Sequence, residues 1–130
     1  MAPELALDHT RGRKGQVEAM LAAVSFRVDV AQERGAVRVS PVGEVDLGTV
    51  GRLRQRLDEA MDAGAGRVIL DLRGTTFCDS STLHLAVDAH DRAVRTGIEF
   101  AIVAGPPGVQ RTFDIAGLSD RLPFVDVPHG

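Results

Sequence analysis

The sequence contains no tryptophan, no tyrosine and only one cysteine, and its five phenylalanines are scattered along 130 residues. The lone Cys78 cannot form a disulfide within the chain, so the fold has to rest on its hydrophobic core. No apolar run of about 18 residues and no signal-peptide pattern is present, and we therefore expect a cytoplasmic protein with no membrane role. The few aromatic residues occupy apolar strand or helix positions, which argues against a surface for stacking nucleic-acid bases.

The charges also lack a concentration of one sign. Acidic and basic residues are interspersed and leave a net charge of −3, which gives no basic patch for nucleic acid. At 130 residues we expect one domain. Residues 1–22 show no sustained periodicity, and we expect them to form a mobile N-terminal extension before a domain that spans 23–130. The alternative for the basic run 11–15 is docking onto an acidic partner.

Apolar residues alternate with polar ones in two segments near the start of this domain. The segments are 26–30 and 37–39, and a turn at 33–35 separates them, as in an antiparallel hairpin with one wet face. By contrast, 68–72 begins with an unbroken apolar run, which is typical of a central strand. We therefore expect the first hairpin strand to be more exposed than the strand at 68–72.

The rest of the domain alternates helical and strand patterns. The remaining predicted elements are helices at 48–63 and 80–96, a strand at 100–103, a helix from Pro106 to Gly117 and a strand at 124–127. In the second helix, the residues expected to face inward are Leu83, Ala86, Val87, His90, Ala93 and Val94. The predicted fold class is α/β: a mixed sheet of about five strands with three to four helices packed mainly on one side.

Two serines open the second predicted helix directly after an aspartate. Backbone N–H groups are unpaired at a helix start and carry partial positive charge, so a phosphate on Ser80 or Ser81 would be tolerated there. The ordinary role of such a serine is to cap the helix. Asp79 could be the cap instead and leave Ser80 facing solvent, with Ser81 as a second acceptor or a structural hydroxyl. Asp46 has the same ambiguity before the first helix.

These residues lie in two motifs whose order and separation resemble those of STAS domain proteins of the anti-sigma factor antagonist type. The motifs are Gly43-Glu44-Val45-Asp46-Leu47-Gly48-Thr49 and, after Ile69-Leu70-Asp71-Leu72, Asp79-Ser80-Ser81-Thr82-Leu83. The resemblance covers roughly residues 24–127 and implies a STAS domain over 23–130. It implies phosphorylation of Ser80, with Ser81 as second choice, by a partner that is both anti-sigma factor and kinase.

The resemblance also implies a surface for this partner and a division of labour with it. The partner-binding residues that it implies are Asp46, Thr49, Asp79, Ser81, Thr82 and His84. Thr82 and His84 replace small residues of the family, and their bulk is expected to hinder docking beside the acceptor. The partner would carry ATP and Mg²⁺, while this chain, a monomer or weak dimer, would need no cofactor of its own.

Other chemistry at these residues is less well supported. A hydrolytic Ser80 with His84 as base and Asp88 behind it would still need a cleft and an oxyanion site, so we do not expect an enzyme. Cys78, His84 and His90 lack the paired spacing of a zinc site. The Gly and Pro residues at 104–108 predict a turn into a helix, because the Lys and Ser/Thr of a phosphate-binding loop are missing. The rival function is a STAS-like scaffold or small-ligand sensor without a phosphorylation switch.

Overall fold

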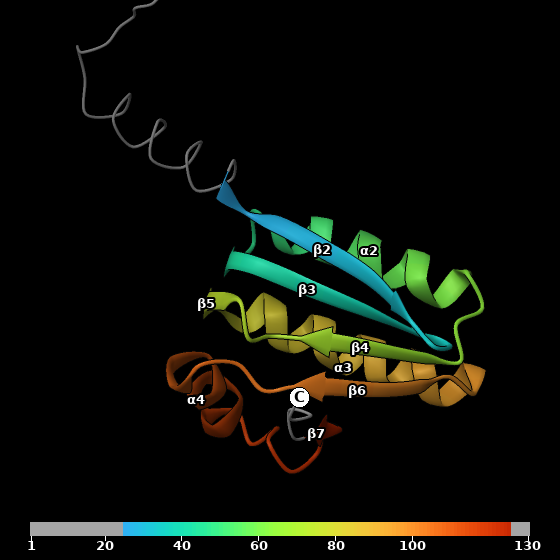
Figure 1. Cartoon of the computed structure of the whole chain (residues 1–130). Coiled ribbons are helices and arrows are strands. Elements are labelled where there is room, and N and C mark those ends of the chain that lie inside the picture. The colour runs from blue at the N-terminus through green and yellow to red at the C-terminus, as the bar shows by residue number, and fades with distance from the viewer. Residues whose placement is uncertain (1–24, 126–130) are drawn as a thin grey trace, which may run out of the picture.

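The computed structural model describes residues 25–125 and contains, within this range, three helices packed on one mixed sheet of six strands (Figure 1). The elements are β2 (Arg27–Glu33), β3 (Ala36–Val45), α2 (Val50–Asp62), β4 (Arg67–Asp71), β5 (Thr75–Cys78), α3 (Ser80–Thr96), β6 (Glu99–Val103), α4 (Pro107–Ile115) and β7 (Phe124–Val125). The predicted fold class is confirmed. The predicted extension and the end of the predicted last strand lie outside the described residues.

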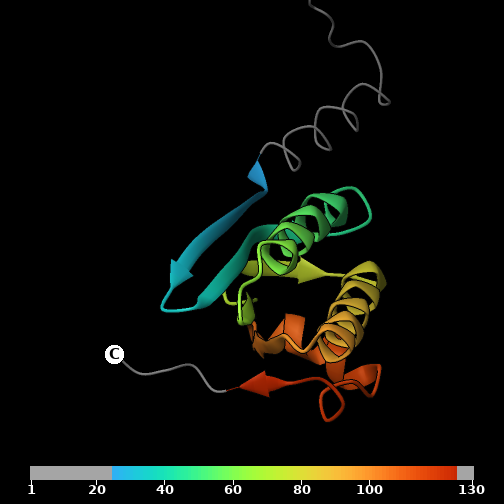
Figure 2. The same ribbon diagram turned by 90° about the vertical axis from the view of Figure 1, so that its right-hand side faces the viewer.

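The sheet has the strand order β2-β3-β4-β6-β7, and β5 pairs with the far end of β3. β2 and β3 form the predicted antiparallel hairpin, which turns at Arg34 and Gly35, both with positive φ. The other pairs are parallel, and α2 and α3 lie together on one face of the sheet (Figure 2). Each long helix therefore connects two parallel strands and brings the chain back to the end of the sheet at which the next strand begins.

The core lies between this face of the sheet and the helices. Val68 and Leu70 of β4 are fully buried, whereas Val30 of β2 is 49% exposed. The predicted difference in burial between these strands is therefore confirmed. At the start of β2 the apolar side is covered, because Phe26 packs under the guanidinium of Arg52, whose carbon lies 5.1 Å from the ring centroid.

The short strand β5 was not predicted from the sequence. It pairs with β3 beyond an irregularity between Gly43 and Glu44, where the N–H of Gly43 donates to the carbonyl of Gly74 at 3.0 Å. Gly43 has φ 112°, a conformation that favours glycine. The long strand β3 thus pairs with β4 along its first half and with β5 at its end, which brings the residues after β3 and β5 together.

The buried stripe of α3 also differs from the prediction. Val94 was expected inside but is 69% exposed, whereas Leu85 and Ala89 are buried, as is Thr82. The buried residues are Thr82, Leu85, Ala86, Ala89 and Ala93, which are three or four positions apart and share one face of the helix, and Val94 lies beyond this face. At the first turn the hydroxyl of Thr82 donates to the carbonyl of Val45 at 3.2 Å, so this face meets the end of β3.

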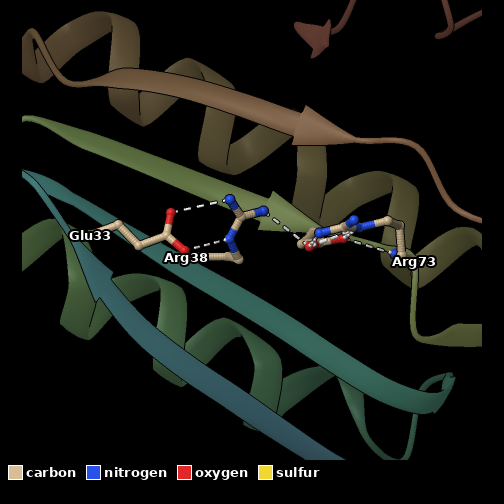
Figure 3. A network of polar contacts seen from close by, with 4 residues as sticks. Glu33, Arg38 and Arg73 are labelled. Atoms are coloured by element: carbon tan, nitrogen blue, oxygen red, sulfur yellow. Dashed lines mark hydrogen bonds and ion pairs between the residues drawn. The ribbon is translucent and has the colours of Figure 1, made fainter. Parts of the chain in front are cut away.

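The face of the sheet opposite the helices has a charged network (Figure 3). Arg38 of β3 donates to Glu33 at 3.0 and 3.1 Å and to Asp71 at 3.1 Å, and Arg73 closes on the same Asp71 carboxylate at 2.7 Å. The side chain of Asp71 is only 6% exposed. Burial would raise the pKa of Asp71, but the hydrogen bonds from Arg73 and Arg38 outweigh it and hold the pKa below its usual value.

Candidate functional site

The candidate site lies where β3 and β5 end and α2 and α3 begin, at the left of Figure 1. Val45 and Cys78 are paired neighbours at the last position of these two parallel strands. Asp46 and Asp79 follow them directly, so the two sequence motifs meet in space. The carboxyl ends of parallel strands are the usual place for such a meeting of loops.

Asp79 is the cap of α3, as one of the two predicted alternatives had it. Its backbone is extended, and its Oδ1 accepts from the N–H of Ser81 at 2.9 Å. The Ser81 hydroxyl also donates to Asp79, and this contact is the main cause that lowers the pKa of the carboxyl. Partial burial opposes the shift, while hydrogen bonds from the N–H groups of Ser81, Leu47 and Thr82 add to it. Asp79 is therefore charged at neutral pH and holds the first turn of α3.

The two serines differ in what they present to solvent. Ser80 is exposed at the first position of α3, while Ser81 is half-buried with its hydroxyl turned to Asp79. An acceptor hydroxyl has to be reached by an incoming phosphoryl group in line with its oxygen. On this ground Ser80 is the better placed of the two.

Two residues expected on the partner surface are buried beneath it instead. Thr82 is 0% exposed and points at the end of β3, so its bulk does not stand beside the Ser80 hydroxyl as we had expected. Thr49 is 5% exposed, and its hydroxyl donates to the carbonyl of Glu44 at 2.8 Å. Both hydroxyls therefore bind backbone carbonyl groups at the end of β3 and stabilise the loops from their buried side.

Asp46 organises the loop before α2. Its Oδ1 accepts from the N–H groups of Gly48 at 2.9 Å and Thr49 at 3.1 Å, which satisfies backbone donors ahead of the helix. Leu47 lies between Asp46 and Gly48, and its side chain is 83% exposed. Asp46 is therefore not the N-cap of α2, which is Thr49, and its carboxylate instead stabilises the turn ahead of the helix. The exposed apolar side chain of Leu47 was not singled out by the sequence pattern.

His84 is exposed one turn into α3. Asp88 does not orient it, because the Asp88 carboxylate accepts from Arg54 of α2 at 3.2 Å. A base on His84 would therefore lack the third group that such a relay requires. His90 is half-buried, as predicted.

The described residues contain no group of three or more His, Cys, Asp or Glu side chains that could hold a metal ion.

In the segment 104–108, a Cβ on Gly105 would come within 2.9 Å of the carbonyl oxygen of Leu72. This close approach explains the glycine, and α4 begins at Pro107 as the turn assignment predicts. Within residues 25–125 no helix is both long and apolar enough to cross a membrane.

A groove on the open face of the sheet lies apart from the serines. It is lined by the β2–β3 turn with Arg34, by Arg38 of β3, by Arg67 at the start of β4, and by Glu99 and Val125. Two of these arginines have acidic partners: Arg38 bonds Glu33, and the Nε of Arg67 lies 3.4 Å from a carboxylate oxygen of Glu99. The groove shares no lining residue with the two motifs.

Comparison with known proteins shows which family matches this chain and which described proteins it is similar to. The STAS domain family matches residues 12–129 of the chain. An anti-sigma F factor antagonist of Paenibacillus polymyxa is 28% identical over 104 residues, which cover 79% of this chain and 89% of that protein.

Two solved structures show the same fold. An anti-sigma factor antagonist from Mycobacterium paratuberculosis has a TM-score of 0.71 at 24% identity, over 77% of this chain and 85% of that one. SpoIIAA from Bacillus in its phosphorylated form has a TM-score of 0.61 at 21% identity, over 81% and 93% of the two chains. At these identities the structural likeness bears on the fold alone.

Proposed function

This chain belongs to the STAS domain family, and from this premise we propose that it is an anti-sigma factor antagonist switched by phosphorylation of Ser80. Unphosphorylated, it binds an anti-sigma factor that is also a serine kinase, and a sigma factor is released. Phosphorylated, it no longer binds. In this proposal the chain is a cytoplasmic substrate of the kinase and not itself an enzyme. The named relative of Paenibacillus polymyxa supports the assignment.

The observation that carries the proposal is the unequal exposure of two neighbouring serines. Ser80 is open to solvent at the N-terminus of a 17-residue helix, and the Ser81 hydroxyl is held by Asp79. The partial positive charge of the helix start stabilises a phosphate on Ser80. The neighbouring Asp79 carboxylate opposes it, so the two effects offset each other in part.

Phosphorylation acts mainly on the surface. It adds about −1.5 to −2 charge units at neutral pH. Because Ser80 is exposed, the core has no reason to rearrange. A partner that packs over the loop would then have to desolvate a dianion, and this cost is large compared with ordinary binding free energies.

The partner supplies the chemistry of transfer. Phosphoryl transfer from ATP needs Mg²⁺ and groups that orient the hydroxyl. Within the part of the chain that the structure describes, the acidic residues at the site are occupied with backbone and hydroxyl donors, as Asp46 and Asp79 show. We therefore assign ATP and Mg²⁺ to the kinase.

Incubation with the cognate kinase and Mg-ATP, followed by mass spectrometry, tests the proposal. One phosphate is expected on Ser80, Ser80→Ala should accept none yet still bind the kinase, and Ser80→Asp should bind more weakly. Ser81→Ala is the matched control and should still be phosphorylated. Phosphate on Ser81 would move the site while keeping the switch. If neither serine is modified and Ser80→Asp binds like the parent, the scaffold or sensor function replaces this one.

A further inference from the structure

We propose that Leu47 and Phe77 form a pair of apolar anchors near Ser80, and that the kinase binds them while its active site closes over Ser80; this rests on the proposed function. Leu47 is 83% and Phe77 50% exposed, although both are large apolar side chains. A single exposed apolar residue needs no explanation, but two beside one reactive hydroxyl mark a contact surface.

Both anchors lie close to Asp79, the residue before Ser80. Leu47 comes two residues after Val45, which pairs with Cys78 where β3 and β5 end side by side. Phe77 lies two residues before Asp79 on β5. The anchors are therefore held at the same short segment from two different elements.

The exposure of Phe77 is seen in the burial pattern of β5. Thr75 and Cys78 at the two ends of the strand are buried, whereas Thr76 and Phe77 between them are exposed. Phe77 is paired with the exposed Glu44. Half of the Phe77 side chain is open to solvent. The neighbouring Thr76 is also exposed, so a polar residue can occupy an exposed position of this strand.

The occupant is the kinase because of what transfer requires. The attacking oxygen must come within about 3–3.5 Å of the phosphorus, so the enzyme's surface has to reach the base of the Ser80 side chain. A protein surface that approaches so closely covers the adjoining residues as well. Leu47 and Phe77 then leave water on binding, which is the main source of affinity at the centre of an interface.

The same contacts explain why the phosphorylated form would let go. A phosphate on Ser80 would lie near two apolar side chains from which the partner has to exclude water. Its hydration would have to be given up for the anchors to remain in contact. The anchors thus provide affinity before the transfer and make the interface intolerant of charge after it.

Binding of purified variants to the cognate kinase, measured by calorimetry, tests the anchors. Leu47→Ser and Phe77→Ser should each raise Kd by at least about tenfold and lower kcat/KM for phosphorylation in parallel. Val94→Ser is the matched control, since it removes a side chain that is 69% exposed but lies in the last turn of α3, at the opposite end of the helix from Ser80. This control should bind like the parent.

Two further measurements keep the outcomes apart. Thermal unfolding should show that the anchor variants remain folded, and the Kd of the parent should change little between about 50 and 500 mM salt, because apolar contacts are not screened. If the parent binds and both anchor variants bind equally well, the anchors are refuted and the proposed function stands. If the parent neither binds nor is phosphorylated, the proposed function itself fails.

Discussion

At the scale of single residues, side chains of one chemical type take different roles according to what lies within reach. Ser80, Ser81 and Thr82 are successive hydroxyls, yet the first is exposed, the second bonds Asp79 and the third bonds the end of β3. The sequence predicts that Asp79 can cap the helix, because capping depends on residues two positions apart. It does not predict the direction of Thr82, which is decided by Val45, 37 positions earlier.

The buried carboxylate of Asp71 should make stability depend on acid pH. Its pKa in the folded protein is lowered, so its contribution is present at neutral pH and is lost as pH falls through the unfolded value of about 3.9 towards the folded value. Asp71→Asn should lower the free energy of unfolding by about 1.5–3 kcal/mol at pH 7. Urea titrations of both proteins should show this difference shrinking below about pH 4.

Asp29→Asn provides the matched control for this prediction. Asp29 also pairs with an arginine, Arg27, at 3.0 Å, but both side chains are more than half exposed. Surface pairs of this kind contribute little. An Asp29→Asn effect as large as that of Asp71→Asn would contradict the role given to burial.

At the scale of elements, the sequence predicts those that depend on local signals and not the one that depends on a distant partner. The helix after Pro106, the hairpin and the starts of α2 and α3 are predicted within two residues or so, because caps, turns and periodicity are local. β5 has only four residues, two of them threonine, and its partner is the end of β3 beyond the bend at Gly43. No pattern within four residues could indicate that pairing.

The glycine that ends α3 should be required for its backbone conformation alone. Gly97 has φ 76°, and a Cβ there would meet nothing within 4 Å. Gly97→Ala should therefore lower the free energy of unfolding by about 1 kcal/mol through backbone strain only. Gly51 in α2 also has open space around it but a helical conformation, so Gly51→Ala should raise stability by up to about 1 kcal/mol. Equal effects of the two changes in a urea titration would rule out this explanation.

At the scale of the whole molecule, the α/β class and the placement of helices on one side follow from the alternation of elements. The charged network on the other face of the sheet does not follow from this alternation. It needs Arg38 and Asp71 on neighbouring strands, which depends on the register that places Arg38 opposite Ile69. Residues that are 33 positions apart carry no common sequence signal of their own.

The layering predicts a gradient of local stability. β4 and β6 each lie between two strands and are buried along most of their length, whereas β2 is at one edge of the sheet and is exposed at six of its seven residues. In native-state hydrogen exchange, the amides of β4 and β6 should exchange at the slowest rates and those of β2 much faster. Equal protection of β2 and β4 would show that the sheet opens only as one unit.

The half-exposed Phe77 also has an optical consequence. Because the chain has no tryptophan or tyrosine, it is nearly silent in ultraviolet fluorescence, and Phe77→Trp would give it a single indole three residues from Ser80. The emission colour of an indole follows its exposure to water. Arrival of a second protein over this loop would shift that emission to shorter wavelength, and its departure after modification would reverse the shift. The molecule thus offers one position at which its state could be followed by light in real time.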